Sequence, residues 1–165
     1  IHIKQVNYKE DFICESIGSN PPVILAREGH PLTGQDITWE KIAAYPLIRL
    51  YIADLEQLAL FQAEGGFGQV QQESEGSFET SHLLTALEVL RNTDFLMPGP
   101  PFARRNPTVG YKIQAIPFPH EITYELEYML VRHRRTEKSA LHNWLWEEVL
   151  TVVEQLRAQA QTDMA

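Results

Sequence analysis

The segment from Pro22 to Ile48 constrains the fold of this chain more than any other part of it. Its first element is an apolar run, Val23 to Ala26, with turn-forming residues on both sides. A short apolar run bounded in this way is typical of a strand buried on both faces of a sheet. We therefore expect a strand over Val23–Arg27, with Phe12–Ile17 as the alternative for the first strand of the chain.

A turn and a short helix follow that strand. The turn has the sequence Gly-His-Pro-Leu at 29–32, in which glycine provides a flexible corner and proline fixes its own φ. The spacing predicts a helix over Thr38–Ala44, with Thr38 as its N-cap. Pro46 disfavours helical backbone at the residue before it, so the chain is expected to leave the helix and enter a second buried strand at Leu47–Leu50.

The rest of the chain alternates between helical and extended patterns. Period and turn signals predict helices over 53–64, 80–91 and 139–157, and strands over 69–74, 95–97, 111–117 and 124–131. In the helix over 80–91, Ser77 or Thr80 is the expected cap, and the turn at 98–101 is expected to end the strand over 95–97. Strands that alternate with helices indicate an α/β fold with a parallel or mixed sheet.

Composition excludes several classes of protein. The 165 residues are 44% hydrophobic, enough for one modest core, and the chain shows neither a signal-peptide pattern nor an apolar run of spanning length. A single cysteine, Cys14, suits a reducing cytoplasm and is expected to be a buried apolar residue. The net charge of −8 argues against direct DNA binding, and the basic run over 132–135 is interpreted as a solvated loop.

Residues for catalysis or metal binding do not form a recognisable pattern. No Gly-x-Ser-x-Gly motif occurs, and the six histidines lack a metal-ligand spacing with carboxylates. The run Gly65-Gly66-Phe67-Gly68 lacks the frame of a phosphate-binding loop and is interpreted as a helix stop. We expect neither enzymatic activity nor a metal ion nor a cofactor.

Several of these segments together resemble the effector-binding domain of LysR-type transcriptional regulators. The resemblance is carried by Gly-His-Pro-Leu at 29–32, the short helix, Tyr-Pro-Leu-Ile at 45–48, Thr93-Asp94 before Met97-Pro98, and Ile-Pro-Phe-Pro at 116–119. It implies a Rossmann-like subdomain of a type 2 periplasmic-binding-protein-like fold that is incomplete at its N-terminus. Residues 27–113 would form most of the second subdomain, and residues 121–157 a returning strand and the last helix of the first. The winged helix-turn-helix that binds DNA in this family is absent from residues 1–165.

The carboxyl ends of three predicted strands are the candidate ligand site. Ligands of open α/β sheets bind beyond the carboxyl ends of strands, where helix N-termini also offer amide donors. In the resembled family these positions line the effector cleft, while capping or turn formation is the alternative role for each residue. The candidate residues are Thr80, Ser81, Glu79, Tyr51, Pro98 and Gly99.

The resemblance implies a sensor that performs no chemistry on its ligand. A small effector, such as an organic acid or an aromatic compound, would bind between subdomains and shift the regulator between states. The family also implies self-association to a dimer or higher, contact with DNA only through the missing N-terminal domain, no membrane contact and a cytoplasmic location. A solute-binding protein of a transporter, which shares the fold, is the alternative, and an enzyme built on the same fold is a third hypothesis.

Overall fold

The computed structural model describes residues 2–3, 10–50, 76–105, 107–119 and 125–162, in two compact units. The first unit combines residues 1–19 with 127–165, and the second contains residues 20–126. The helix predicted over 53–64, the strand over 69–74 and the candidate residue Tyr51 lie outside the described residues.

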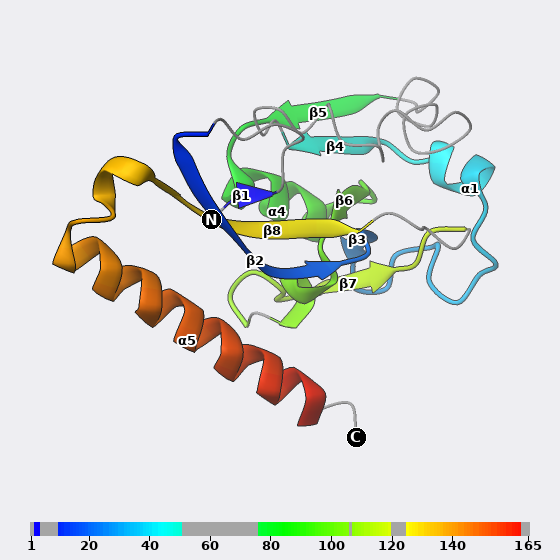
Figure 1. The fold of residues 1–165 in the computed structure, drawn as a ribbon. Helices are drawn as coiled ribbons and strands as arrows, with labels where there is room; N and C mark the ends of the chain where they lie inside the picture. Colours follow the sequence, from blue (N-terminus) through cyan, green and yellow to red (C-terminus); the bar gives the residue numbers. More distant parts are fainter. Residues whose placement is uncertain (1, 4–9, 51–75, 106, 120–124, 163–165) are drawn as a thin grey trace. The chain divides into compact units, whose positions relative to one another are not determined.

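The second unit is built on a mixed sheet (Figure 1). In it, β3 (Val23–Arg27) pairs antiparallel with both β6 (Met97–Gly99) and β7 (Ile113–Ile116). Next to β6, β4 (Leu47–Leu50) pairs parallel with β5 (Ser77–Thr80), and a parallel bridge from Leu47 to Leu96 joins β4 to the chain that enters β6. The order across this unit is thus β5-β4-β6-β3-β7, with β3 as the one strand of opposite direction among these five.

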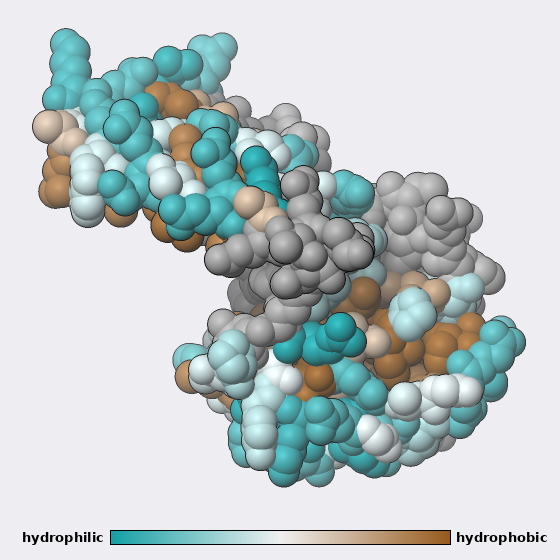
Figure 2. Space-filling model, turned by 90° about the horizontal axis from the view of Figure 1, so that it is seen from below, coloured by the Kyte–Doolittle hydropathy of each residue, from teal (hydrophilic) through white to brown (hydrophobic). Residues whose placement is uncertain are grey.

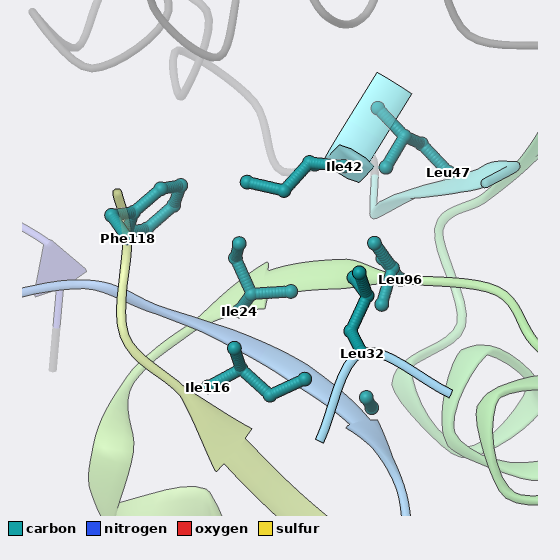
Figure 3. Packing of buried hydrophobic residues seen from close by; sticks show 8 residues of the cluster. Ile24, Leu32, Ile42, Leu47, Leu96, Ile116 and Phe118 are labelled. Carbon is teal, nitrogen blue, oxygen red and sulfur yellow. The ribbon is translucent and has the colours of Figure 1, made fainter. Parts of the chain in front are cut away.

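Alternation along β3 divides the core into two layers. Ile24 and Ala26 point to one face, where they meet Leu32, Ile42 and residues of neighbouring strands. Figure 3 shows Ile24, Leu32 and Ile42 pointing toward one another between the sheet and the short helix α1 (Trp39–Ala43). Leu25 points to the opposite face, which α4 (Leu83–Asn92) covers with three buried residues, Ala86, Leu87 and Leu90. The prediction of a strand buried on both faces is therefore confirmed.

The turn and helix predicted after β3 are present. Gly29 has φ = 68°, the left-handed region that favours glycine, and His30 N–H donates to the Arg27 carbonyl over 3.2 Å. Thr38 caps α1, because its Oγ1 accepts a hydrogen bond from Lys41 N–H over 3.3 Å. The chain then enters β4 at Leu47, as Pro46 predicts.

The helix predicted over 80–91 begins later than expected, at Leu83, and its N-cap is His82. Neither Ser77 nor Thr80 caps it, because both residues belong to β5. Every residue from Ser77 to Thr80 has a direct partner on β4. Pairing with an adjacent buried strand decides the backbone here, since local capping preference contributes only about 1 kcal/mol.

Pro98 and Gly99 also differ from the sequence prediction, which placed them in a turn after the strand. They form the last two residues of β6, with Pro98 opposite Ile24 and Gly99 opposite Val23. A Cβ atom at Gly99 would lie 2.6 Å from Cδ1 of Leu25, closer than side chains approach one another. Glycine is therefore needed for close packing against β3 rather than for a turn.

The first unit contains a three-stranded sheet and the longest helix. The strand order is β1-β8-β2, in which β1 (His2–Ile3) pairs antiparallel with β8 (Leu126–His133), and β2 (Phe12–Asn20) flanks β8 on the other side. Cys14 on β2 is half-buried rather than buried as predicted.

Arg132 of β8 contacts the 23-residue helix α5 (Ala140–Thr162) through two side chains. Arg132 Nη1 donates to Asn143 Oδ1 over 2.6 Å, and its guanidinium carbon lies 4.6 Å from the ring centroid of Trp146. A hydrogen bond and a cation–π contact from one side chain fix the start of α5 against β8.

We expect truncation of a side chain of α4 to lower the free energy of unfolding only where that side chain is on the buried face of the helix. Leu90 is fully buried, whereas Leu84 on the same helix is 71% exposed. Leu90→Ala should lower the free energy of unfolding by about 2–5 kcal/mol, and the matched control Leu84→Ala by less than about 0.5 kcal/mol. Urea unfolding followed by circular dichroism measures both values, and equal costs for the two variants would contradict the assigned faces of α4.

Candidate functional site

The carboxyl ends of three strands of the second unit lie along one edge of its sheet. Leu50 at the end of β4 is paired with Thr80 at the end of β5. Gly99 ends β6 three residues after Leu96, which is itself bridged to Leu47 three residues before Leu50. Two strand spacings separate the ends of β5 and β6, about 10 Å. Residues from these strands, which are distant in the sequence, therefore share one edge.

Thr80 and Ser81 occupy the turn that leads from this edge into α4. The half-buried Thr80 accepts a hydrogen bond at Oγ1 from His82 N–H over 3.1 Å, and Ser81 is exposed. The first hydrogen bond within the helix runs from Ala86 N–H to the His82 carbonyl, so the amides of residues 83–85 precede it. The His82 side chain makes no capping hydrogen bond. This end of α4 combines hydroxyl groups, amide donors and the positive end of the helix dipole.

The other candidate residues contribute differently. Successive side chains of a strand point to opposite faces, and Phe78 on β5 packs into the core layer beneath α4. Thr80 therefore shares the face of α4, while Glu79, which is exposed, emerges on the other face of the sheet. Pro98 and Gly99 lie at the same edge as Thr80, as components of β6.

Two further features of this edge were not predicted from the sequence. The start of β3 and the end of β7 lie at the same edge, because Val23 is paired with Gly99 and Ile24 with Ile116. The prolines at 21–22 and 117 mark these strand ends in the sequence and could have indicated them. In addition, Leu83 and Leu84 in the first turn of α4 are 44% and 71% exposed, so apolar surface lies directly beside the hydroxyl groups.

The described residues offer little for catalysis or metal binding at this edge. No group of three or more His, Cys, Asp or Glu side chains within the described ranges could hold a metal ion. His30, the histidine of the turn, is buried and lies near the opposite edge, since it follows Arg27 at the far end of β3. The edge thus offers hydrogen-bond donors, one helix terminus and apolar contact, which is the chemistry of binding.

Among the described residues, one histidine and one tyrosine, His30 and Tyr128, have clearly shifted pKa values, and neither belongs to a strand end of this edge. Burial lowers the pKa of His30 below its usual value, so the ring is neutral at pH 7. Burial also raises the pKa of Tyr128 on β8 to about 12, so its phenol is neutral as well.

A mixed α/β sheet with several strand ends and one helix N-terminus at one edge is the arrangement at which open α/β sheets bind ligands. The family model of the LysR substrate binding domain matches residues 3–154, which is most of the chain. The chain therefore belongs to the substrate-binding domains of LysR-type transcriptional regulators. A comparison with curated protein sequences found no significant match.

Solved structures share this fold at low sequence identity. A protein of Vibrio parahaemolyticus assigned as a transcriptional regulator is 21% identical, with a TM-score of 0.67, and the match covers 93% of this chain and 69% of that one. The regulatory domain of MexT, a transcriptional activator in Pseudomonas aeruginosa, is 17% identical, with a TM-score of 0.64 and coverages of 86% and 68%. HinK, a LysR family transcriptional regulator from P. aeruginosa, is 12% identical, with a TM-score of 0.65 and coverages of 93% and 52%.

These comparisons confirm the family and the type 2 periplasmic-binding-protein-like fold predicted from the sequence, and they favour a regulator over a transporter component. The chain spans between about half and about two thirds of the length of those three structures. Among the helices in the described ranges, none is long and apolar enough to cross a membrane.

The Thr80 hydroxyl should stabilise the turn before α4. Thr80→Val keeps the shape but removes the acceptor for His82 N–H, and it should lower the free energy of unfolding by about 0.5–1.5 kcal/mol. Thr80→Ser retains the acceptor and serves as the control. Chemical denaturation measures both variants, and equal stability of the two would show that the hydrogen bond contributes nothing.

Proposed function

We propose that this chain is the effector-sensing portion of a LysR-type transcriptional regulator, and that residues 20–126 act as one of two walls of its effector cleft. In this proposal residues 27–113 make up most of the second subdomain, and residues 121–157 belong to the first. The observation that carries the proposal is the convergence of β4, β5, β6 and the N-terminus of α4 along one edge. This portion binds its ligand without converting it, works in the cytoplasm and reaches DNA through another domain of the regulator.

Thr80 and Ser81 are the residues that we propose to contact the effector. Thr80 Oγ1 already accepts the His82 amide, so its hydroxyl proton remains for donation to a ligand acceptor. Ser81 is exposed, and the amides of residues 83–85 lie next to it along the chain. An anion gains from donors of this kind, because the helix dipole adds positive potential where they point.

The exposed leucines extend the proposed ligand class from acids to acids that carry an apolar part. Leu83 and Leu84 together present a large apolar area within one turn of the hydroxyl groups. Burying such a side chain contributes about 1.5–3 kcal/mol. Small organic acids and aromatic compounds combine the two features, and in the proposal Glu79, Tyr51, Pro98 and Gly99 complete this wall.

The proposal also includes coupling between ligand and regulator. An effector shifts the regulator only if it binds one arrangement of the domain more tightly than the other. A preference of 5- to 150-fold, about 1–3 kcal/mol, is typical of such coupling. The difference in ligand-binding free energy between the two arrangements then shifts the regulator toward the one that binds the ligand more tightly, and this changes how the regulator meets DNA.

A thermal-shift screen of small organic acids and aromatic compounds on the complete regulator tests this proposal. A ligand at 100 times its Kd stabilises the native state by about 2.7 kcal/mol and raises Tm. Ser81→Ala should reduce the shift, whereas Ser77→Ala, at the amino end of the same strand β5, should leave it unchanged. If a hit shifts Tm equally in both variants, Ser81 does not contact the effector.

Self-association is part of the same proposal, and α5 supports it. Several large apolar side chains of α5 are 49–69% exposed, namely Leu141, Trp144, Leu145, Val152 and Leu156. Figure 2 shows hydrophobic residues open to solvent among hydrophilic ones on one face of the molecule. Leu141, Leu145, Val152 and Leu156 follow one another at intervals of four or seven residues, which places them on one face of the helix, so they form one stripe, as the sequence predicted. Leaving such a stripe in water is unfavourable, and a second copy of the chain could cover it.

We expect the chain to be a dimer or higher at micromolar concentration. Leu145→Glu should shift the equilibrium toward monomer, because it places a charge within the stripe. The control Arg157→Gln changes the net charge by the same amount at an exposed position of the same helix away from the stripe, and it should leave the equilibrium unchanged. Light scattering across a dilution series measures the association. A clean monomer of the unmodified chain at micromolar concentration would contradict self-association.

A further inference from the structure

His30 is the one polar or charged residue of the described ranges whose side chain is buried, with 1% of its surface exposed. It lies in the turn after β3, at the edge of the sheet opposite the proposed effector wall. Its ring stacks at an angle on Tyr45, with the two ring centroids 4.7 Å apart. A buried polar ring in this position needs a partner at each nitrogen.

Both ring nitrogens have such a partner, and the partners fix where the proton lies. Nδ1 accepts a hydrogen bond from Leu32 N–H over 3.1 Å, and a nitrogen that accepts in this way carries no proton. Nε2 lies 3.2 Å from the carbonyl oxygen of Asp94, which can only accept, so Nε2 carries the proton. The geometry therefore assigns one neutral tautomer to His30.

These two hydrogen bonds join segments that are distant in the sequence. One partner is within the turn at 29–32, and the other is in the turn between α4 and β6. Arg27, at the end of β3, reinforces the same junction, because its Nε and Nη2 donate to Asp94 Oδ1 over 2.8 and 2.7 Å. The junction thus ties the end of β3 to the segment that leads into β6.

A second proton on the ring would disrupt this junction. Protonated Nδ1 would present an N–H toward Leu32 N–H, so two donors would face each other and the hydrogen bond within the turn would be lost. The ring would also carry a charge at a buried position beside Tyr45, which packs against the core cluster that contains Ile24 and Ile42. Two charged groups act on the ring: the Asp94 carboxylate favours the added proton, and the Arg27 guanidinium opposes it.

We infer that His30 is an acid-sensitive latch, which holds the turn after β3 to the turn before β6 while its ring is neutral and releases it on proton uptake. Desolvation outweighs the attraction of Asp94 and keeps the pKa of the folded protein's His30 below its usual 6.5. The unfolded chain therefore binds this proton more readily than the folded chain. Stability is fully present above about pH 6.5 and is lost as pH falls below that value, toward the lower pKa of the folded state.

Unfolding in denaturant between pH 7.5 and 5 tests the latch. In the unmodified chain the unfolding equilibrium constant should rise by up to about tenfold per pH unit as pH falls from 6.5 to the lower pKa of the folded protein's His30. His30→Gln should lose this dependence, because glutamine offers a donor and an acceptor but does not titrate. The control His82→Gln, at an exposed position, should retain it. An equal pH dependence in the unmodified chain and in His30→Gln would overturn the inference.

A direct measurement on the unmodified chain covers the case in which His30→Gln does not fold. Nitrogen-15 NMR of the imidazole rings distinguishes a bare Nδ1 from a protonated one. A proton on Nε2 alone, unchanged between pH 7.5 and 6.5, supports the latch. A proton on Nδ1 in this range, with or without one on Nε2, would contradict it. Neither measurement requires an effector, so failure of the latch and failure of the proposed function are separate outcomes.

Discussion

The pairing of β3 with two neighbours of opposite direction is the constraint on which the second unit depends. This strand of five residues supplies side chains to both core layers and hydrogen bonds to both β6 and β7. Because its backbone has neighbours on two sides and its side chains are covered on two faces, none of its residues can be polar without a partner. Successive side chains of β3 point to opposite faces of the sheet, with Ile24 beneath α1 and Leu25 beneath α4. The side chains of the adjoining strands are divided between the same two faces.

The opposite direction of β3 also determines where binding chemistry can gather. Because the other strands run the same way, their carboxyl ends share one edge with the start of β3, and the turn that contains His30 lies at the other edge. One edge carries amides, hydroxyl groups and exposed leucines. The other is closed by the hydrogen bonds of His30 and the ion pair of Arg27 with Asp94. The groups proposed for ligand binding and the hydrogen bonds of the His30 turn therefore lie at opposite ends of the same strands.

Sequence patterns identified most elements whose residues have a strong local preference. The strand at Val23–Arg27, the cap at Thr38 and the strand at Leu47–Leu50 all form where the pattern predicts. Errors fall at 77–80 and 98–99, where a cap and a turn were expected but strand residues were found, and at 132–133, which belong to β8 rather than to a loop. A cap is a local hydrogen bond, whereas β5 and β6 exist because β4 and β3 lie beside them, and a local pattern contains no information about that neighbour.

The sequence by itself determined the family, the α/β class and the candidate residues at 79–81, because turn residues, apolar runs and helix periods are local and survive in a single chain. Only the tertiary structure decided that these residues share an edge with Gly99, that Glu79 leaves from the opposite face, and that His30 is buried with both nitrogens occupied. Those features arise from strand direction and from contacts between segments more than 60 residues apart, such as His30 with Asp94. The free energy of such contacts depends on which surfaces meet, and those surfaces meet only when the chain has folded.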